Sequence, residues 1–243
     1  MKLVAVLTGQ NLNKELDIFK KYKNYIYAVE IRADFLYPEL SKINKIITKL
    51  KSLSPSTKII LTFRSKAEGG KTKISENQRK NIITNLLKEN HKYVNFVDIE
   101  FFSKIFPHIA KLTNNYHKKL IISCHFNKTI SEKKLIQVFN KIKNKTFHTH
   151  YKPIIKIVVR RQNLNQYFNM LRKLNSFKRN IFTNLSIFTI GKTSVQSRLI
   201  GLLIKMPLVY SSLYLPVIST QPTLPQLLNF ASKIGICSLE KNN

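Results

Sequence analysis

The sequence predicts a single (β/α)8 barrel that occupies residues 1–243, and three observations favour this fold class. Eight short apolar runs, each of strand length, recur along the chain at fairly regular intervals. The segments between these runs are long enough for the crossover helix that joins parallel strands. The length of 243 residues is typical of one barrel of this kind. An open, doubly wound sheet is the alternative that the same pattern permits.

Each apolar run is rich in Val, Ile, Phe or Tyr and nearly continuous, as is typical of strands buried on both faces. The runs are 3–7, 25–31, 58–63, 93–99, 120–124, 154–159, 185–190 and 208–213. Between them, the segment 75–87 shows helical periodicity, and Ser131 followed by Glu132 marks a second helix start. Eight strand–helix repeats most economically form a closed parallel barrel.

The charge balance is unusual, because 42 Lys and Arg oppose 12 Asp and Glu to give a net charge of +30. Such an excess suggests a nucleic acid or another anionic surface as a partner. The surplus is mostly Lys, however, and it is scattered along the chain. The aromatic residues lie inside apolar runs and do not alternate with Arg, as a stacking surface for bases would require. We therefore expect no specific nucleic-acid partner.

The remaining composition favours a cytoplasmic protein without a membrane segment. No apolar run approaches the ~20 residues needed to cross a bilayer. The opening residues 1–8 have too short an apolar stretch for a signal peptide and no small-residue cleavage site. Cys124 and Cys237 lie far apart, so we do not expect a disulfide framework.

The scarce acidic residues gather where strands end. Five of the twelve follow or close an apolar run, namely Glu30, Asp34, Glu68, Asp98 and Glu100. In a barrel the active site is built at these strand ends. Glu30 and Asp98 lie within apolar runs, where an unpaired charge is costly, and Arg32 and Arg64 are their expected partners. A purely structural ion network is the alternative interpretation.

His125 closes the fifth run, in the same layer as these carboxylates. A single histidine is more often structural than catalytic, but its place at the end of a buried strand favours a catalytic role. The other histidines lie in helical or loop segments and provide no set of three ligands, so the sequence predicts no metal site.

Lys156 gives the sharpest signal, because it stands alone in the apolar run 154–159. Lysine is almost never fully buried without a reason, and a closed barrel offers no edge strand for it. If its side chain enters the barrel near Arg64 and Arg198, burial and positive neighbours favour the neutral amine. A neutral amine is the form that adds to a carbonyl. Together with His125 and the carboxylates, Lys156 predicts an imine-forming enzyme that acts on a ketone or aldehyde.

Six short stretches, in order along nearly the whole chain, resemble the type I 3-dehydroquinate dehydratase family. They are Glu30-Ile31-Arg32-Ala33-Asp34, Thr62-Phe63-Arg64-Ser65 with Glu68-Gly69-Gly70, Val97-Asp98-Ile99-Glu100, Ser123-Cys124-His125, Ile155-Lys156-Ile157 and Ser197-Arg198-Leu199. The resemblance implies a (β/α)8 barrel, usually a homodimer, that removes water from 3-dehydroquinate in the shikimate pathway to aromatic amino acids. It also implies that no metal and no cofactor take part.

The resemblance further implies a role for each matching residue. Lys156 would form the imine with the substrate ketone. His125 would remove the proton beside the imine carbon and later protonate the departing hydroxyl, with Glu68 orienting its ring. Arg198 would hold the substrate carboxylate. The substrate hydroxyls would contact Glu30, Arg32 and Arg64.

The loop after the last run departs from the family pattern, which reads Ser-Ala-Pro-Gly-Gln. Ser219 aligns readily as a substrate-binding residue, whereas the glutamine is Gln221 in a shorter loop or Gln226 in a longer one. We prefer Gln221.

Two other functions remain open at this point. A class I aldolase would share the barrel and the imine, but it needs a glycine-rich phosphate site, and the segment 216–225 contains no glycine. A basic nucleic-acid-binding protein would not need Lys156, His125 and Glu68 together.

Overall fold

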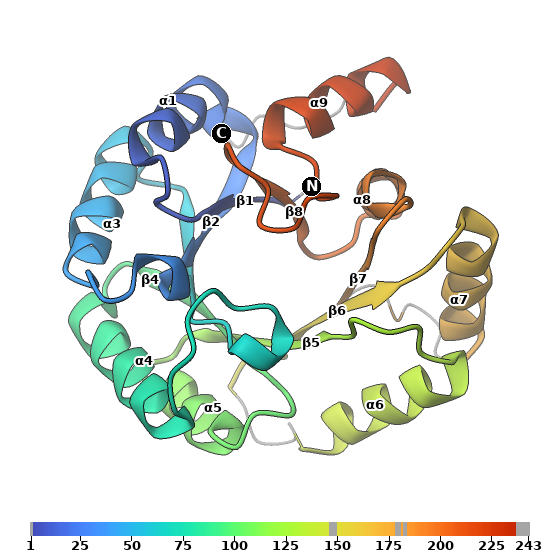
Figure 1. The fold of residues 1–243 in the computed structure, drawn as a ribbon, viewed down its shortest axis with the longest axis horizontal. Helices are drawn as coiled ribbons and strands as arrows, with labels where there is room; N and C mark the ends of the chain where they lie inside the picture. The colour runs from blue at the N-terminus through green and yellow to red at the C-terminus, as the bar shows by residue number, and fades with distance from the viewer. Residues whose placement is uncertain (1, 146–149, 178–180, 182–183, 237–243) are drawn as a thin grey trace.

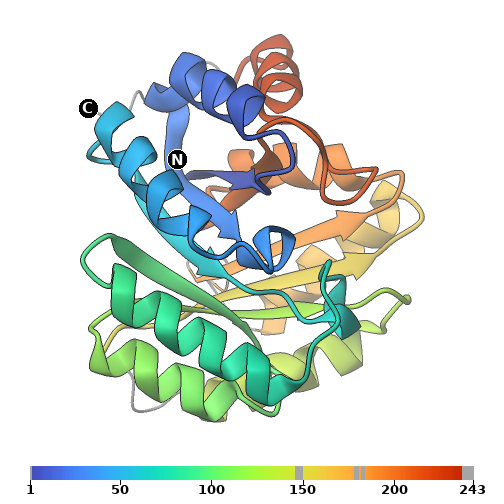
Figure 2. The ribbon, with the colours of Figure 1, turned by 60° about the vertical axis from the view of Figure 1, so that its left-hand side comes forward.

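Eight parallel strands form a nearly closed barrel inside a ring of helices, a single-domain (β/α)8 architecture (Figure 1). The computed structural model describes residues 2–145, 150–177, 181 and 184–236. Cys124 is buried on the fifth strand, and Cys237 lies outside the described residues. Turned by 60°, the barrel shows its strands enclosed by the helices in front (Figure 2).

The strands are β1 (Leu3–Leu7), β2 (Ile26–Arg32), β3 (Lys58–Thr62), β4 (Val94–Glu100), β5 (Lys119–His125), β6 (Ile154–Arg160), β7 (Leu185–Ile190) and β8 (Val209–Ser212). Every predicted apolar run is one of these strands, and the bounds agree to within one residue at each end. Both faces of the strands are buried, as the near-continuous apolar runs predicted. The barrel prediction is therefore confirmed.

The main helices are α1 (Leu12–Tyr22), α3 (Lys42–Leu53), α4 (Glu76–Asn90), α5 (Phe106–Asn115), α6 (Glu132–Lys145), α7 (Leu164–Phe177), α8 (Ser194–Leu203) and α9 (Leu224–Lys233). The short α2 (Ala33–Leu36) follows β2. Both expected helix starts are present: a capping box of Ser75 and Gln78 begins α4, and the hydroxyl of Ser131 accepts a hydrogen bond from the backbone of Lys134 in α6.

The barrel has a seam between its seventh and eighth strands. The hydrogen-bonded order runs β7-β6-β5-β4-β3-β2-β1-β8, and within the described residues no backbone ladder joins β7 to β8. A side chain bridges the gap instead. The hydroxyl of Ser186 on β7 donates to the Leu208 carbonyl at 2.7 Å and accepts from the Leu208 amide at 3.1 Å. Polar side chains thus hold the barrel together where the backbone pairing is interrupted.

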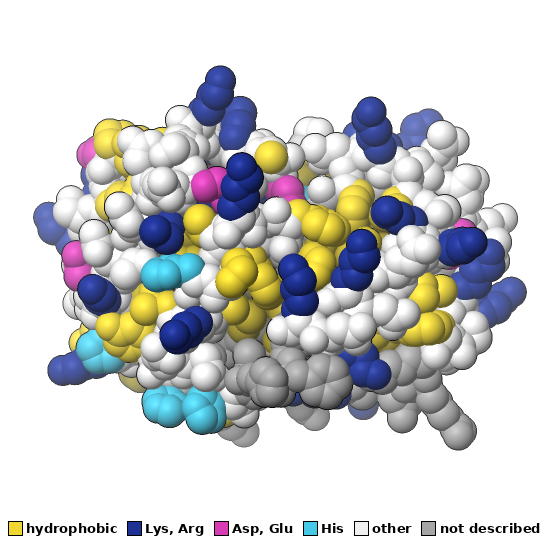
Figure 3. Space-filling model, turned by 90° about the horizontal axis from the view of Figure 1, so that it is seen from below, with side chains coloured by type: hydrophobic (Ala, Val, Ile, Leu, Met, Phe, Trp, Pro, Cys, Tyr) yellow, Lys and Arg dark blue, Asp and Glu magenta, His cyan; other side chains and the backbone are white. Residues whose placement is uncertain are grey.

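The surface carries most of the excess positive charge. On the face shown in Figure 3, Lys and Arg side chains stand dispersed among apolar and uncharged ones, without a continuous basic patch. Within the part of the chain that the structure describes, no helix is long and apolar enough to cross a membrane.

Candidate active site

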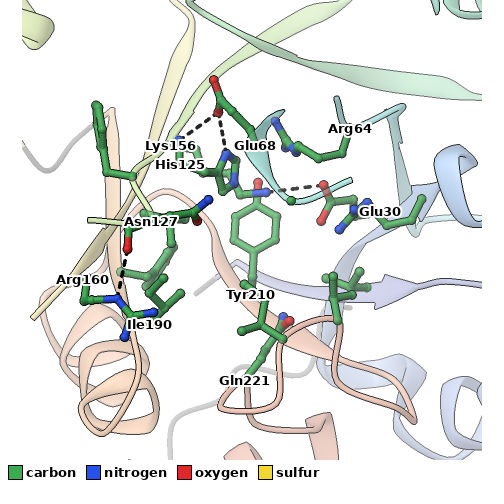
Figure 4. Close-up of a pocket in the computed structure, with 18 of the residues that line it drawn as sticks. Glu30, Arg64, Glu68, His125, Asn127, Lys156, Arg160, Ile190, Tyr210 and Gln221 are labelled. Carbon is green, nitrogen blue, oxygen red and sulfur yellow. Dashed lines mark hydrogen bonds and ion pairs between the residues drawn. The ribbon is translucent and has the colours of Figure 1, made fainter. Parts of the chain in front are cut away.

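A cavity of about 260 Å³ lies at the carboxyl-terminal ends of the strands, where a barrel of this kind places its chemistry. Eight of the nine side chains that the sequence singled out line it, and Figure 4 shows several of them facing one another. The eight are Glu30, Arg32, Arg64, Glu68, His125, Lys156, Arg198 and Gln221. Ser219 is exposed, and the structure does not bring it into this cavity.

Lys156 projects from the middle of β6 into the barrel and is only 6% exposed. Its neighbours across the two adjacent strands are Ser123 and Ser186, whose small side chains leave room for it. From the sequence we expected burial, with Arg64 and Arg198 nearby; the amine is buried in a cavity that both arginines line, and the charged groups that contact it are carboxylates. The amine lies 3.2 Å from Asp98 Oδ2 and 3.4 Å from Glu30 Oε1, so Lys156 forms ion pairs with two carboxylates.

Asp98 is shared by two of the cations that line the cavity, Arg64 and Lys156. Its Oδ1 accepts hydrogen bonds from Arg64 at 2.9 Å and from the Ser123 hydroxyl at 2.6 Å, while Oδ2 faces Lys156. Burial opposes ionisation, but Arg64 and Lys156 outweigh it and lower the pKa of Asp98. The predicted pairing of Asp98 with Arg64 is therefore confirmed.

The sequence had suggested that Glu30 pairs with Arg32, but the structure does not show this pair. Its Oε1 accepts a hydrogen bond from Thr62 at 2.8 Å and contacts Lys156. Arg32 instead forms two hydrogen bonds of 2.9 Å with Asp34, two residues along the chain. The order of charges along the sequence could not reveal this exchange of partners, because it depends on which side chains point into the barrel.

His125 and Glu68 form a hydrogen-bonded pair at the end of β5. Glu68 Oε2 accepts from the backbone amide of His125 at 2.9 Å and lies 3.0 Å from Nδ1, so an ionised Glu68 requires the ring proton on Nδ1. Burial, followed by the charges of Arg64, Lys156 and Arg32, lowers the pKa of His125 well below 6.5. The imidazole is thus neutral at pH 7, and Nε2 is the nitrogen that can accept a proton.

The pKa of the Glu68 carboxyl group is shifted in the opposite direction to that of His125. Burial is the largest effect and raises the pKa of Glu68 to about 7, with Arg64 opposing it and Glu100 adding to it. A histidine with a lowered pKa beside a carboxyl with a raised pKa is an arrangement suited to moving protons near neutral pH.

Arg198 on α8 reaches the cavity between β7 and β8 and is 4% exposed. Its Nε donates to the Tyr210 carbonyl at 2.8 Å, and Nη1 donates to the carbonyl and hydroxyl of Ser194 at 2.8 and 2.7 Å. Burial lowers the pKa of Arg198 to about 10, so it stays charged at pH 7. No Asp or Glu in the described part of the chain forms an ion pair with it. Arg198 is a buried cation suited to a ligand's carboxylate.

The loop after β8 brings one glutamine to the cavity. Gln221 is 9% exposed and lines the cavity, and its backbone amide bonds to Ile218 within the loop. Gln226 is used elsewhere, because it forms the capping box of α9 with Thr223. Val217 and Ile218 contribute the other cavity contacts of this loop, in the region where Ser219 had been expected.

Two features of the site could not be read fully from the sequence. Asp98 had been noted as a strand-end acid, but its place between Arg64 and Lys156 depends on the registers between four strands, β3 to β6. Tyr210 lies in the apolar run of β8 and resembled a core residue, yet it lines the cavity beside Lys156 (Figure 4). Its neighbours along β8 gave no signal of this.

The arrangement has a definite chemical capacity. A buried amine can add to a carbonyl group, a neutral imidazole can accept and return a proton, and an arginine without a carboxylate partner can bind an anionic ligand. Within the described residues, no three His, Cys, Asp or Glu side chains are grouped so as to hold a metal ion.

The chain is similar to known proteins in both sequence and fold. A family model described as type I 3-dehydroquinase matches residues 3–236. The fold is similar to that of a type I 3-dehydroquinate dehydratase from Clostridium difficile, solved with covalently modified comenic acid (TM-score 0.76, 21% identity, 97% of this chain and 92% of that chain). It is also similar to the 3-dehydroquinate dehydratases of Geobacillus kaustophilus (TM-score 0.79, 18% identity, 98% and 92%) and Aquifex aeolicus (0.70, 22%, 97% and 100%).

Proposed function

This chain belongs to the type I 3-dehydroquinase family, and on that premise we propose how its residues convert 3-dehydroquinate to 3-dehydroshikimate, a dehydration in the shikimate pathway. The observation that carries the proposal is the buried amine of Lys156 in a cavity that His125 and Arg198 also line. Amine, proton acceptor and anion site are the three groups that a Schiff-base dehydration of a keto acid requires.

In the first step Lys156 forms an imine with the substrate ketone. Starting from the lysine ammonium, the nitrogen loses one proton and bonds to the carbonyl carbon, and the ketone oxygen leaves as water with two of the three nitrogen hydrogens. The protonated imine that results is an electron sink, because its nitrogen accepts the electron pair released at the neighbouring carbon. Glu30 and Asp98, both within 3.4 Å of the nitrogen, stabilise its positive charge.

In the second step His125 acts as base and then as acid. Its neutral imidazole takes the proton from the carbon beside the imine, and the electron pair moves onto the imine nitrogen. The carbon–oxygen bond of the substrate hydroxyl then breaks as His125 returns the proton, and water leaves. Glu68 holds the ring through Nδ1 and stabilises the imidazolium that forms in between. Addition of one water to the imine releases the product and the Lys156 amine.

The remaining polar groups bind the substrate. We assign its carboxylate to Arg198 and its hydroxyls to Arg32, Arg64 and Glu30, which line the same cavity. Gln221 is the loop residue that we assign to substrate contact, since the neighbouring Ser219 lies outside the cavity.

Dehydration and trapping experiments test the proposal together. Adding 3-dehydroquinate should produce the ultraviolet absorbance of a conjugated enone, and borohydride should then leave a covalent adduct on Lys156, located by peptide mass spectrometry. His125→Ala should still be trapped while its kcat falls by roughly 100- to 10,000-fold. Lys156→Ala should be neither trapped nor active.

A matched control comes from the adjacent strand. Lys119 begins β5 and is exposed away from the cavity, so Lys119→Ala should keep both the activity and the adduct. An adduct on a different lysine, or a Lys156→Ala variant with near-normal turnover, contradicts the assignment.

We also propose that the enzyme is a cytoplasmic homodimer, as the family resemblance implies. Sedimentation equilibrium at micromolar concentration should give twice the 28.3 kDa mass of the chain. A monomer under these conditions would contradict the dimer without affecting the mechanism.

A further inference from the structure

Tyr210 is in direct contact with the lysine of the reaction. Its ring face lies 3.9 Å from Lys156 Nζ, measured to the ring centre, and the residue is only 3% exposed (Figure 4). A cation over an aromatic face is attracted to it, so the ring favours the charged forms of this nitrogen. The protonated imine is one of these forms, and the ring can therefore stabilise the electron sink as well as the free ammonium.

The ring is held in place by its own strand and by a second aromatic residue. The backbone carbonyl of Tyr210 accepts from Arg198 Nε at 2.8 Å. The ring of Phe188 on β7 packs edge to face against that of Tyr210, with 6.1 Å between their centres. Tyr210 thus connects the lysine that bonds to the substrate with the arginine assigned to its carboxylate.

The hydroxyl of Tyr210 is the unusual part of this residue. It is fully buried and has no hydrogen-bond partner in the described part of the chain. Most buried polar groups are paired, and an unpaired buried hydroxyl destabilises the folded protein. Burial raises the pKa of Tyr210 well above 10, and the negative charges of Glu30 and Asp98 add to this effect. The hydroxyl therefore keeps its proton at pH 7 and remains a hydrogen-bond donor.

We propose that Tyr210 positions the Lys156 nitrogen with its ring face and that its unpaired hydroxyl donates a hydrogen bond to the ketone oxygen of the substrate while Lys156 adds to the carbonyl carbon. This inference rests on the proposed function and adds a residue to its first step. The ketone oxygen is two bonds from the lysine nitrogen once the new bond forms. It therefore develops its negative charge beside the ring that the nitrogen contacts.

The step balances without any further reactant. A lysine ammonium and a ketone give a protonated imine and one water, and both hydrogens of that water come from the lysine nitrogen. The ammonium first loses one proton, the lone pair of the neutral amine forms the nitrogen–carbon bond, and the electron pair of the carbonyl moves to oxygen. Two hydrogens from the nitrogen end on that oxygen, and the carbon–oxygen bond then breaks to release water. Tyr210 keeps its own proton and only stabilises the charge on the departing oxygen.

Two tyrosine-to-phenylalanine variants separate this role from a structural one. Tyr210→Phe removes an unpaired hydroxyl and should raise the melting temperature, while slowing adduct formation in rapid-quench borohydride trapping by roughly 10- to 100-fold. Tyr167 offers the matched control, because it is equally buried but outside the cavity and donates to the Ile187 carbonyl at 2.9 Å. Tyr167→Phe should lower the melting temperature and leave the trapping rate unchanged.

A third variant tests the ring. Tyr210→Leu removes the aromatic face as well, so its adduct should form more slowly than that of Tyr210→Phe. A wild-type trapping rate in Tyr210→Phe, with the wild-type protein active, would overturn the inference and leave the proposed function intact. A wild-type protein that forms neither enone nor adduct would overturn both.

Discussion

The carboxylate of Asp98 lies 3.2 Å from the amine of Lys156, and its second oxygen accepts a hydrogen bond from Arg64 at 2.9 Å. One fully buried anion thus serves two buried cations. Removing one partner of a buried ion pair is more costly than the pair itself is stabilising, because the remaining charge stays buried without compensation.

Asp98→Asn should therefore destabilise the fold by about 3–5 kcal/mol, measured by urea unfolding. Asp17 on the exposed side of α1 provides the control, and Asp17→Asn should change stability by less than about 0.5 kcal/mol. Equal unfolding midpoints for the two variants would show that Asp98 does not balance these cations.

Arg198→Lys keeps a positive charge but loses the planar guanidinium that can bind a carboxylate through two hydrogen bonds. We expect KM to rise and kcat/KM to fall by roughly 10- to 100-fold, with a smaller change in kcat. Arg172 is exposed on α7, and Arg172→Lys should have wild-type kinetics. A KM unchanged in Arg198→Lys would remove this residue from substrate binding.

The lowered pKa of His125 predicts the acid side of the pH–rate profile. The neutral imidazole is the active form, and a pKa well below 6.5 means that the ring becomes protonated only at lower pH. The kcat/KM should therefore stay level as the pH falls through 6.5, and the decline should be centred well below pH 6.5. A decline centred above pH 6.5 that persists in Glu68→Gln would contradict the assignment of His125 as the base.

The raised pKa of Glu68 predicts a pH-dependent effect on stability. In the folded protein the carboxyl group of Glu68 stays protonated up to about pH 7, whereas in the unfolded chain it loses its proton near pH 4.5. Between these values the folded state binds more protons, so the contribution of Glu68 becomes less favourable as pH rises. Glu68→Gln should gain stability relative to wild type between pH 5 and pH 8, by calorimetry, while losing activity. A stability difference that is constant with pH would refute this.

The dispersed Lys side chains predict weak binding to nucleic acid. A gel shift with random duplex at low salt should disappear at moderate salt, because such binding depends on counterion release. Selective binding that survives physiological salt would reveal a site that the scattered charge does not explain.

The strands could be predicted from sequence because burial on both faces leaves an unmistakable mark, a continuous apolar run. The same property concealed Tyr210, which lies in such a run and resembles its neighbours. Which residues of β8 face the cavity depends on strand register and tilt, and these follow from the whole barrel. Lys156 could be identified from the sequence because a charged residue is unusual in an apolar run.

Partners among the charged residues could not be predicted, because neighbours in sequence differ from neighbours in the barrel. Arg32 forms hydrogen bonds with Asp34, two residues further along the chain, and Lys156 contacts Glu30, which is 126 residues away in sequence. The structural role of Gln226 could have been predicted from the sequence alone. The pattern Thr223-Leu224-Pro225-Gln226 is a capping box with proline in the first turn, which assigns Gln226 to the start of α9.

The hydrogen bonds of Arg198 join the two strands that border the β7–β8 seam. Its guanidinium donates to the carbonyl of Thr189 on β7 and to that of Tyr210 on β8, so a substrate carboxylate bound to this arginine, as we propose, would favour the state in which the two strands lie together. By thermodynamic linkage, whatever binds the closed seam also disfavours its opening. Backbone amides of β7 and β8 should then exchange their hydrogens with deuterated water more slowly when a substrate or product is bound.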